Sequence, residues 1–124
     1  MGNVYVLAEE CDHQIMENDT GADLAQEDFA IIGSIPCVAD NAIASGAFGS
    51  FHVEPFLTIR TDELKSGEDT FDTENSLVYW DDTNKVFSDT ETADYYIVGQ
   101  LKYAKGTNDY ITFVKFPTAE LVVT

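Results

Sequence analysis

Few side chains in this sequence have the types and spacing that catalysis requires. A nucleophilic mechanism needs a nucleophile, a base beside it and a group that orients the base. The possible participants are Cys37 or a serine, with His13 or His52 as the base. His13 lies in an acidic segment and His52 on the polar face of a predicted strand, and neither stands beside a recognisable nucleophile motif. We therefore expect no catalytic residue and interpret both histidines as surface or partner-contact residues.

Paired carboxylates are a second kind of candidate. Glu9-Glu10 and Asp81-Asp82 would suit general acid–base chemistry if both groups of a pair reached one substrate atom. Adjacent residues of a strand point to opposite faces of a sheet, however, so neither pair converges. These carboxylates do not predict an enzyme.

Oxygen-rich turns are a third kind of candidate. Asp19–Asp23 and Asp81–Asn84 place carboxylates near turns, as calcium sites do. Neither has the long loop with a closing Glu that makes the calcium motif specific. Cys11 and Cys37 have no Cys-x-x-Cys spacing and no metal-ligand pattern with the histidines, while a disulfide between them stays open. We predict no metal and no cofactor.

The charge balance narrows the possible partners. Six basic residues face 23 acidic ones, for a formal net charge of −17. Nucleic acids and anionic membranes both attract positive charge, so neither is expected as a partner. No apolar run is long enough for a membrane helix, and the N-terminus lacks the basic and apolar regions of a signal peptide. High solubility is the plainest consequence, while divalent-cation binding and a salt-rich habitat stay open.

The elements that must position these residues are short strands. Between Ser76 and Phe116, four apolar, aromatic-rich segments alternate with turn-forming residues. Asp81–Asn84 separates the first two segments, and Lys105–Asn108 separates the last two, where Gly and Asn can take the positive φ of a hairpin turn. We predict two antiparallel hairpins that form a meander in the C-terminal third.

Shorter apolar runs continue this pattern upstream. Phe29–Ile32, Ile35–Ala39 and the two halves of Phe48–Ile59 each fit a strand, with Pro36 at an edge or a bulge. The whole chain then has about eight to ten short, mostly antiparallel strands. This predicts an all-β fold, a small β-barrel or β-sandwich, with an extended N-terminal arm.

The N-terminal part has a different character. Asn3–Ala8 is a predicted strand with apolar residues on both faces, so either its own core or a neighbouring subunit must cover it. Glu9–Asp28 holds eight carboxylates, and we expect an exposed loop or arm there, with brief extended pieces at Gln14–Met16. We therefore divide the chain into residues 1–27, an N-terminal strand and acidic arm, and residues 28–124, the barrel or sandwich, within one structural domain.

The order of these segments resembles the capsid decoration proteins, or cement proteins, of tailed phages and prophages, many of which are catalogued as domains of unknown function. The resemblance is carried by the Tyr-Trp-Asp of residues 79–81, the Val-Gly-Gln-Leu of residues 98–101, and the segments Ile32–Ala39 and Ala44–Gly49. It covers roughly residues 28–116. The shared positions are structural glycines and core residues rather than reacting groups.

This resemblance implies a non-enzymatic protein that binds the exterior of an assembled phage head and stabilises it by bridging major capsid protein subunits. It implies the major capsid protein and further copies of the chain, in a dimer or trimer, as partners. Its location would be the virion, after assembly in the host cytoplasm. A calcium- or glycan-binding β module is the alternative function.

Two regions are candidate contacts with the capsid or a sister subunit. The first is the terminal strand, with Val4, Tyr5, Val6 and Leu7, and the second is an apolar patch at Phe48 and Phe56, which ordinary core packing explains equally well. We further expect the acidic face to point outward and the few basic residues to cluster toward the capsid. Because like charges packed densely repel one another, binding should then strengthen with added salt or divalent cations.

Overall fold

The protein is an all-β molecule, which confirms the predicted fold class. The computed structural model describes residues 4–6, 13–66 and 70–123, and these contain ten strands and no helix. In chain order the strands are β1 (Val4–Val6), β2 (His13–Glu17), β3 (Phe29–Ile32), β4 (Ile35–Ala39), β5 (Phe48–His52), β6 (Thr58–Thr61), β7 (Leu77–Asp81), β8 (Val86–Ser88), β9 (Tyr96–Leu101) and β10 (Ile111–Leu121).

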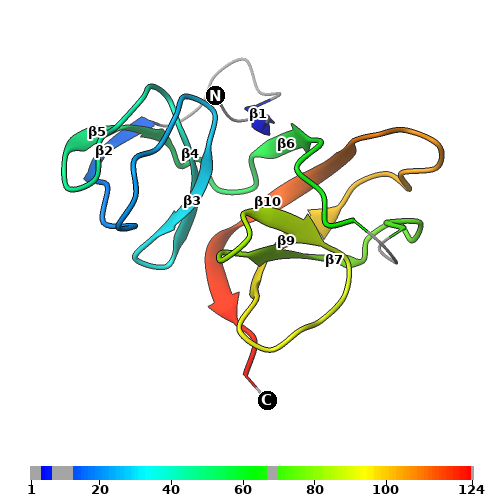
Figure 1. Ribbon diagram of the computed structural model, residues 1–124. Helices are drawn as coiled ribbons and strands as arrows, with labels where there is room; N and C mark the ends of the chain where they lie inside the picture. The colour runs from blue at the N-terminus through cyan, green and yellow to red at the C-terminus, as the bar shows by residue number, and fades with distance from the viewer. Residues whose placement is uncertain (1–3, 7–12, 67–69, 124) are drawn as a thin grey trace.

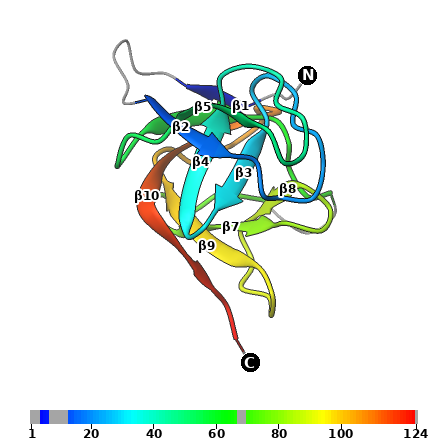
Figure 2. The ribbon, with the colours of Figure 1, turned by 90° about the vertical axis from the view of Figure 1, so that its left-hand side faces the viewer.

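The strands form two curled antiparallel sheets that lie side by side (Figure 1). The larger sheet has six strands in the order β1-β6-β10-β9-β7-β8, and the smaller has four in the order β2-β5-β4-β3. In the view turned by 90°, the smaller sheet stands in front of the larger one (Figure 2). The long strand β10 connects the two sheets, because it pairs with β6 and β9 in the larger sheet and contacts β4 of the smaller one.

Both predicted hairpins of the C-terminal third are confirmed, but the predicted meander is wrong, because β9 pairs with β7 and leaves β8 at the edge of the sheet. The turn between β7 and β8 contains Lys85 at φ 59°, and the connection between β9 and β10 contains Gly106 at φ 58°. Asp81 holds the first turn, because its carboxylate accepts hydrogen bonds from the backbone N–H groups of Thr83 and Asn84 and from the Asn84 side chain. Short polar side chains that bond to nearby backbone stabilise such reversals.

Two hydrophobic cores lie on the two faces of the smaller sheet, since alternate residues of a strand point in opposite directions. Val38 belongs to the core between the sheets, together with Phe29, Trp80, Phe87 and other buried residues. Its neighbour Ala39 belongs to the second core, which the loops around Leu24 and Ile43 close.

The described strand residues of the N-terminal part, 4–6 and 13–17, are paired into the two sheets. β1 pairs antiparallel with β6, and β2 pairs antiparallel with β5 over all five of its residues. The described part of the expected acidic arm, residues 13–28, therefore begins with an edge strand. Its carboxylates are compatible with this position because alternate side chains of an edge strand face solvent.

Asn18 ties the loop after β2 to the rest of the smaller sheet. The Asn18 side chain is fully buried, and its amide donates hydrogen bonds to the carbonyl oxygens of Ala22 and Ile43. Its carbonyl oxygen accepts hydrogen bonds from the N–H and hydroxyl of Thr20. All of the polar capacity of this side chain is thus used inside the fold.

Pro36 is tolerated in an interior strand because the pairing there is incomplete. β4 lies between β3 and β5, yet its pairing with β5 covers only Val38 and Ala39. Pro36 faces Ile31 of β3 and lies beyond the point where β5 pairs. A residue without an N–H fits such a position, but the predicted edge or bulge at Pro36 is wrong, because β4 is an interior strand and its pairing with β3 has no bulge.

Candidate functional site

A cavity of about 500 Å³ lies against the outer face of the larger sheet. Ile111 and Phe113 point into the core, so Thr112 between them points outward, and its register partner on β6 is Arg60. The connection between β9 and β10 forms the other wall. The side chains that matter most for charge and stacking there are Arg60, Lys102, Tyr103, Lys105 and Tyr110.

This cavity is basic in an otherwise acidic chain. Arg60, Lys102 and Lys105 line it, which is three of the six basic residues in the sequence. No ion pair with a described residue is recorded for any of the three. Their charge is therefore not neutralised by an ion pair with a described acidic side chain.

Aromatic rings hold two of these cations in place. The Arg60 guanidinium carbon lies 4.5 Å from the centre of the Tyr110 ring, and the Lys102 Nζ lies 5.5 Å from the centre of the Tyr103 ring. Cation–π contacts of this kind restrict long side chains without neutralising their charge. The sequence did not predict this cavity, because Arg60 and Tyr110 are brought together only by the pairing of β6 with β10.

Three of the four predicted contact residues of the terminal strand lie in the described strand β1. Val4 is buried in the core between the sheets, so its side chain is covered by its own subunit. Tyr5 and Val6 complete β1, whose second edge is unpaired among the described residues, while Leu7 lies outside the described residues. Val4 is thus covered by the core of its own chain, which is one of the two alternatives predicted for this strand.

The two predicted apolar contacts are exposed, and they lie at or beyond opposite ends of β5. Phe48 is 69% exposed and Phe56 is 62% exposed. Phe48 begins β5 and Phe56 follows its end, and five residues of strand span about 13 Å. Phe48 instead has an apolar neighbour on β2, Ile15, which is 66% exposed. Ile15 pairs with Ser50 and Phe48 with Glu17, so the two apolar side chains are diagonal neighbours on one face.

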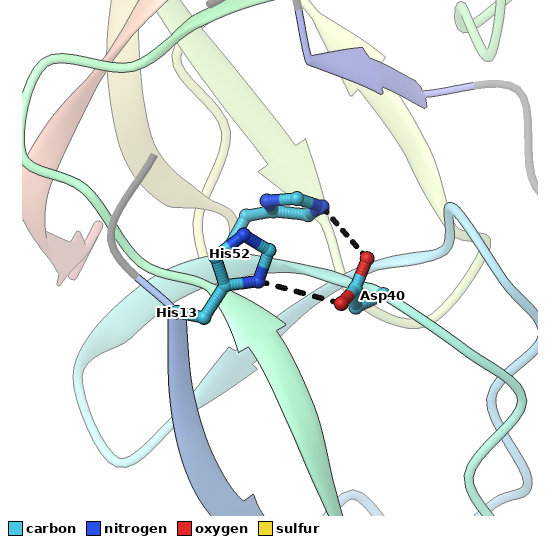
Figure 3. Close-up of side chains that lie close together, drawn as sticks. All are labelled: His13, Asp40 and His52. Carbon is cyan, nitrogen blue, oxygen red and sulfur yellow. Dashed lines mark ion pairs between the residues drawn. The ribbon is translucent and has the colours of Figure 1, made fainter. Parts of the chain in front are cut away.

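A cluster of metal-ligand side chains lies at the other end of β2 and β5. His13 and His52 are register partners, and their ring centres lie 4.4 Å apart. Asp40, which follows β4, lies between them: Oδ2 is 3.3 Å from His13 Nδ1, and Oδ1 is 3.2 Å from His52 Nε2 (Figure 3). The sequence did not predict this cluster, because the expected exposed arm would have kept His13 away from the sheet.

His52 is the least accessible member of this cluster. Burial lowers the pKa of His52 below 6.5, and the neighbouring His13 lowers it further, while Asp40 acts in the opposite direction. His52 Nδ1 is buried and has no hydrogen-bond partner among the described residues. A second proton would leave a buried N–H unsatisfied, which agrees with the lowered pKa.

The acidic turns use their oxygens inside the fold. Asp81 is buried, and its pKa is lowered because hydrogen bonds from the Asn84 side chain and from the Asn84 and Thr83 backbone outweigh the opposing effect of burial. Asp23 accepts a hydrogen bond from the Ser45 backbone N–H. Within the described residues, the group of three His, Cys, Asp or Glu side chains whose ligand atoms converge is His13, Asp40 and His52, and no acidic turn forms one.

Cys37 is a core residue, as its apolar surroundings predicted. It is fully buried, its Sγ donates to the carbonyl oxygen of Ala30, and burial raises the pKa of its thiol to about 12. A thiol that stays protonated is a poor nucleophile. Cys11 lies outside the described residues.

Comparison with protein families identifies the relatives of this chain. The family described as phage cement protein matches residues 10–116, which is most of the sequence. The chain belongs to this family. Membership indicates a structural protein of the phage capsid. No curated protein and no solved structure matches this cement protein. A search of the described residues for a helix long and apolar enough to cross a membrane finds none.

Proposed function

We propose that this cement protein binds the exterior of the assembled phage head and stabilises it by bridging neighbouring major capsid protein subunits. The observation that carries this proposal is the basic cavity, since half of the basic residues of a chain with net charge −17 gather there. In the proposed orientation of the bound protein, the cavity faces the capsid and most of the acidic surface faces outward. Charge complementarity of this kind fixes orientation and speeds association.

The apolar pair of Ile15 and Phe48 is the second proposed contact. Both side chains are more than half exposed, and exposed apolar neighbours on one strand pair are typical of interaction surfaces. The unpaired edge of β1 is a third, since an open strand edge can pair with a strand of another chain. Together these surfaces lie on different elements, so one copy can contact more than one neighbour.

Stabilisation would come from the sum of many such contacts. A shell offers a repeated arrangement of identical sites, and a dimer or trimer of the cement protein engages several at once. Each contact can then be weak while the complete layer resists pressure from inside. Lateral repulsion between the acidic outer faces opposes full occupancy, so added salt or divalent cations should favour a complete layer where this repulsion outweighs the attraction at the cavity, which salt also screens.

Charge reversal in the basic cavity tests the proposal. Lys102→Glu places a negative charge in the cavity, and Lys85→Glu makes the same change at an exposed lysine outside it. Undecorated heads, made without the cement protein, are mixed with each variant and sedimented. We expect Lys102→Glu to reduce the bound protein at least several-fold and Lys85→Glu to bind like the wild type.

The melting temperature of each variant is measured alongside its binding to heads, so a loss of binding can be separated from a loss of folding. Because both lysines are exposed, we expect both variants to fold, and thermal melting checks this. Equal binding by all three proteins would refute the role of the cavity. Absence of binding by the wild type to undecorated heads would refute the proposed function as a whole.

A further inference from the structure

We propose that His13, Asp40 and His52 form a binding site for a divalent transition-metal ion of the zinc class. The three residues come from β2, from the residue after β4 and from β5, so a bound ion would join three neighbouring strands of the smaller sheet. Two imidazoles and a carboxylate are ligands that zinc takes readily. Magnesium and calcium prefer all-oxygen sites, so they are not the ions this set selects.

The spacing of the ligand atoms fits a small ion. A tetrahedral zinc ion with bonds of about 2.0–2.2 Å separates its ligand atoms by about 3.4 Å. Asp40 lies 3.3 Å from His13 Nδ1 and 3.2 Å from His52 Nε2, and the converging atoms all lie within 4.8 Å of one another. Closing the remaining gap needs only a small rotation of His13, whose side chain is 45% exposed.

The backbone positions all three ligand residues before any ion binds. His13 and His52 are directly opposite in the β2–β5 register, and the Asp40 N–H donates to the Ser50 carbonyl oxygen on β5. Figure 3 shows the two rings, from β2 and β5, and the carboxylate of Asp40 pointing toward one another. Such pre-organisation reduces the entropy lost on binding. The strongly negative chain also raises the local concentration of cations.

The surroundings of His52 limit the affinity of the proposed site for a metal ion. A metal on His52 Nε2 leaves the ring proton on Nδ1, the buried atom that has no hydrogen-bond partner among the described residues. Loss of such a supporting partner typically weakens metal binding about 10–100-fold. We therefore expect tighter binding than a random pair of surface carboxylates provides and weaker binding than a closed structural zinc site provides.

A bound ion would stabilise the N-terminal part of the chain. β2 is an edge strand whose neighbour in the sheet is β5, so it has a partner on one side. A metal link from His13 to Asp40 would attach β2 to the end of β4 as well. Because the ion binds the folded state, its presence should raise the melting temperature as its concentration rises.

Cobalt and zinc are the probes that test this site. Thiols bind both ions, so every protein in the test carries Cys11→Ser, while Cys37 is buried with a pKa of about 12 and is left unchanged. Excess magnesium occupies the acidic surface. We expect the parent protein to bind one Co²⁺ per chain, with the visible absorption of a tetrahedral site, and Zn²⁺ to displace it and to raise the melting temperature.

Two substitutions in β2 provide the comparison. His13→Gln removes an exposed ligand and should weaken Co²⁺ binding by more than about tenfold and abolish the melting shift. Glu17→Gln removes one exposed charge from the same strand and should change neither. The proposal is overturned if the parent protein shows no tetrahedral cobalt spectrum, or if His13→Gln and Glu17→Gln bind the ions equally well.

Discussion

Phe29 of β3 and Trp80 of β7 meet edge to face across the two sheets, with ring centres 4.8 Å apart and planes at 61°. Phe87 contacts both rings, at 5.0 Å from Phe29 and 4.6 Å from Trp80. The three residues form an aromatic junction between sheets that share no strand pair. Edge-to-face contacts of buried rings add to the stabilisation that burial itself provides.

Removal of the Phe29 ring should therefore loosen the attachment of the smaller sheet. We expect Phe29→Ala to lower the free energy of unfolding by about 3–5 kcal/mol, as large deletions in cores do. Urea denaturation, monitored by the fluorescence of Trp80, measures this free energy of unfolding. Phe48→Ala, at an exposed phenylalanine, should change the value by less than about 0.5 kcal/mol. Similar losses for the two variants would contradict the junction.

Lys115 is fully buried, and its Nζ donates a hydrogen bond to the Phe116 carbonyl oxygen. Burial lowers its pKa from 10.5, against the opposing effects of Cys37 and Glu54. The unfolded chain therefore binds this proton more tightly, and the charged amine destabilises the folded state at neutral pH. Lys115→Met should raise the free energy of unfolding by about 1–2 kcal/mol at neutral pH.

The pH dependence of this gain distinguishes charge from packing. As the pH rises through the lowered pKa of the folded state and past 10.5, the wild-type amine loses its proton first in the folded and then in the unfolded state, and the advantage of Lys115→Met should shrink. Urea denaturation of both proteins at neutral and at high pH gives the difference. An advantage that stays constant with pH would point to packing alone.

His52 should make the protein sensitive to mild acid. Its pKa is lowered from 6.5 by burial, so below pH 6.5 the unfolded chain binds the proton first and the folded state loses stability. We expect the free energy of unfolding of the wild type to fall relative to His52→Gln between pH 7.5 and pH 6. A chelator is present throughout. Parallel pH profiles of the two proteins would contradict a buried neutral imidazole.

Gly99 and Gly106 should respond differently to alanine. A Cβ at Gly99 would lie 2.5 Å from the Val114 carbonyl oxygen and 2.6 Å from the Phe113 ring, so Gly99→Ala should cost about 1–3 kcal/mol or more. A Cβ at Gly106 meets nothing within 4 Å, and only its φ of +58° opposes the change. Gly106→Ala should cost about 1 kcal/mol. Thermal melting of both variants would reveal a reversed order, which would contradict the close approach of β9 and β10.

Phe48 offers a test of the apolar contact that is independent of charge. Because the side chain is exposed, Phe48→Ser should leave the melting temperature unchanged. If the capsid covers it, binding to undecorated heads should weaken about 30-fold per contact, for about 2 kcal/mol of apolar burial. Val123→Ser, at another exposed apolar residue, serves as the matched control. Equal binding of the two variants would remove Phe48 from the contact surface.

The parts of the fold that depend on neighbours in sequence could be predicted. The turns at Asp81–Asn84 and Lys105–Asn108 have residues that favour reversal, and the flanking apolar segments then pair with little choice. The class of fold follows from such local signals. The position of Pro36 was not predicted, because an interior strand also tolerates a missing N–H where its pairing with one neighbour stops short of the proline.

The parts that depend on distant pairing could not be predicted. His13 joins Asp40 and His52 only because β2 pairs with β5 in one register, and a shift by one residue would turn His13 to the opposite face. The acidic composition of residues 9–28 also favoured an exposed arm, although alternation in an edge strand accommodates it. Likewise, the basic cavity needs Arg60 and the β9–β10 connection, which are far apart in sequence.

The fully buried Asn18 has a practical consequence for producing this protein. Asn18-Asp19-Thr20 is an acceptor sequence for N-linked glycans, and transfer acts on chains that are still unfolded. A sugar on Asn18 would occupy the amide that binds Ala22 and Ile43, and the loop could not close over the second core. Passage through a eukaryotic secretory pathway should thus yield misfolded material, whereas bacterial expression avoids the modification.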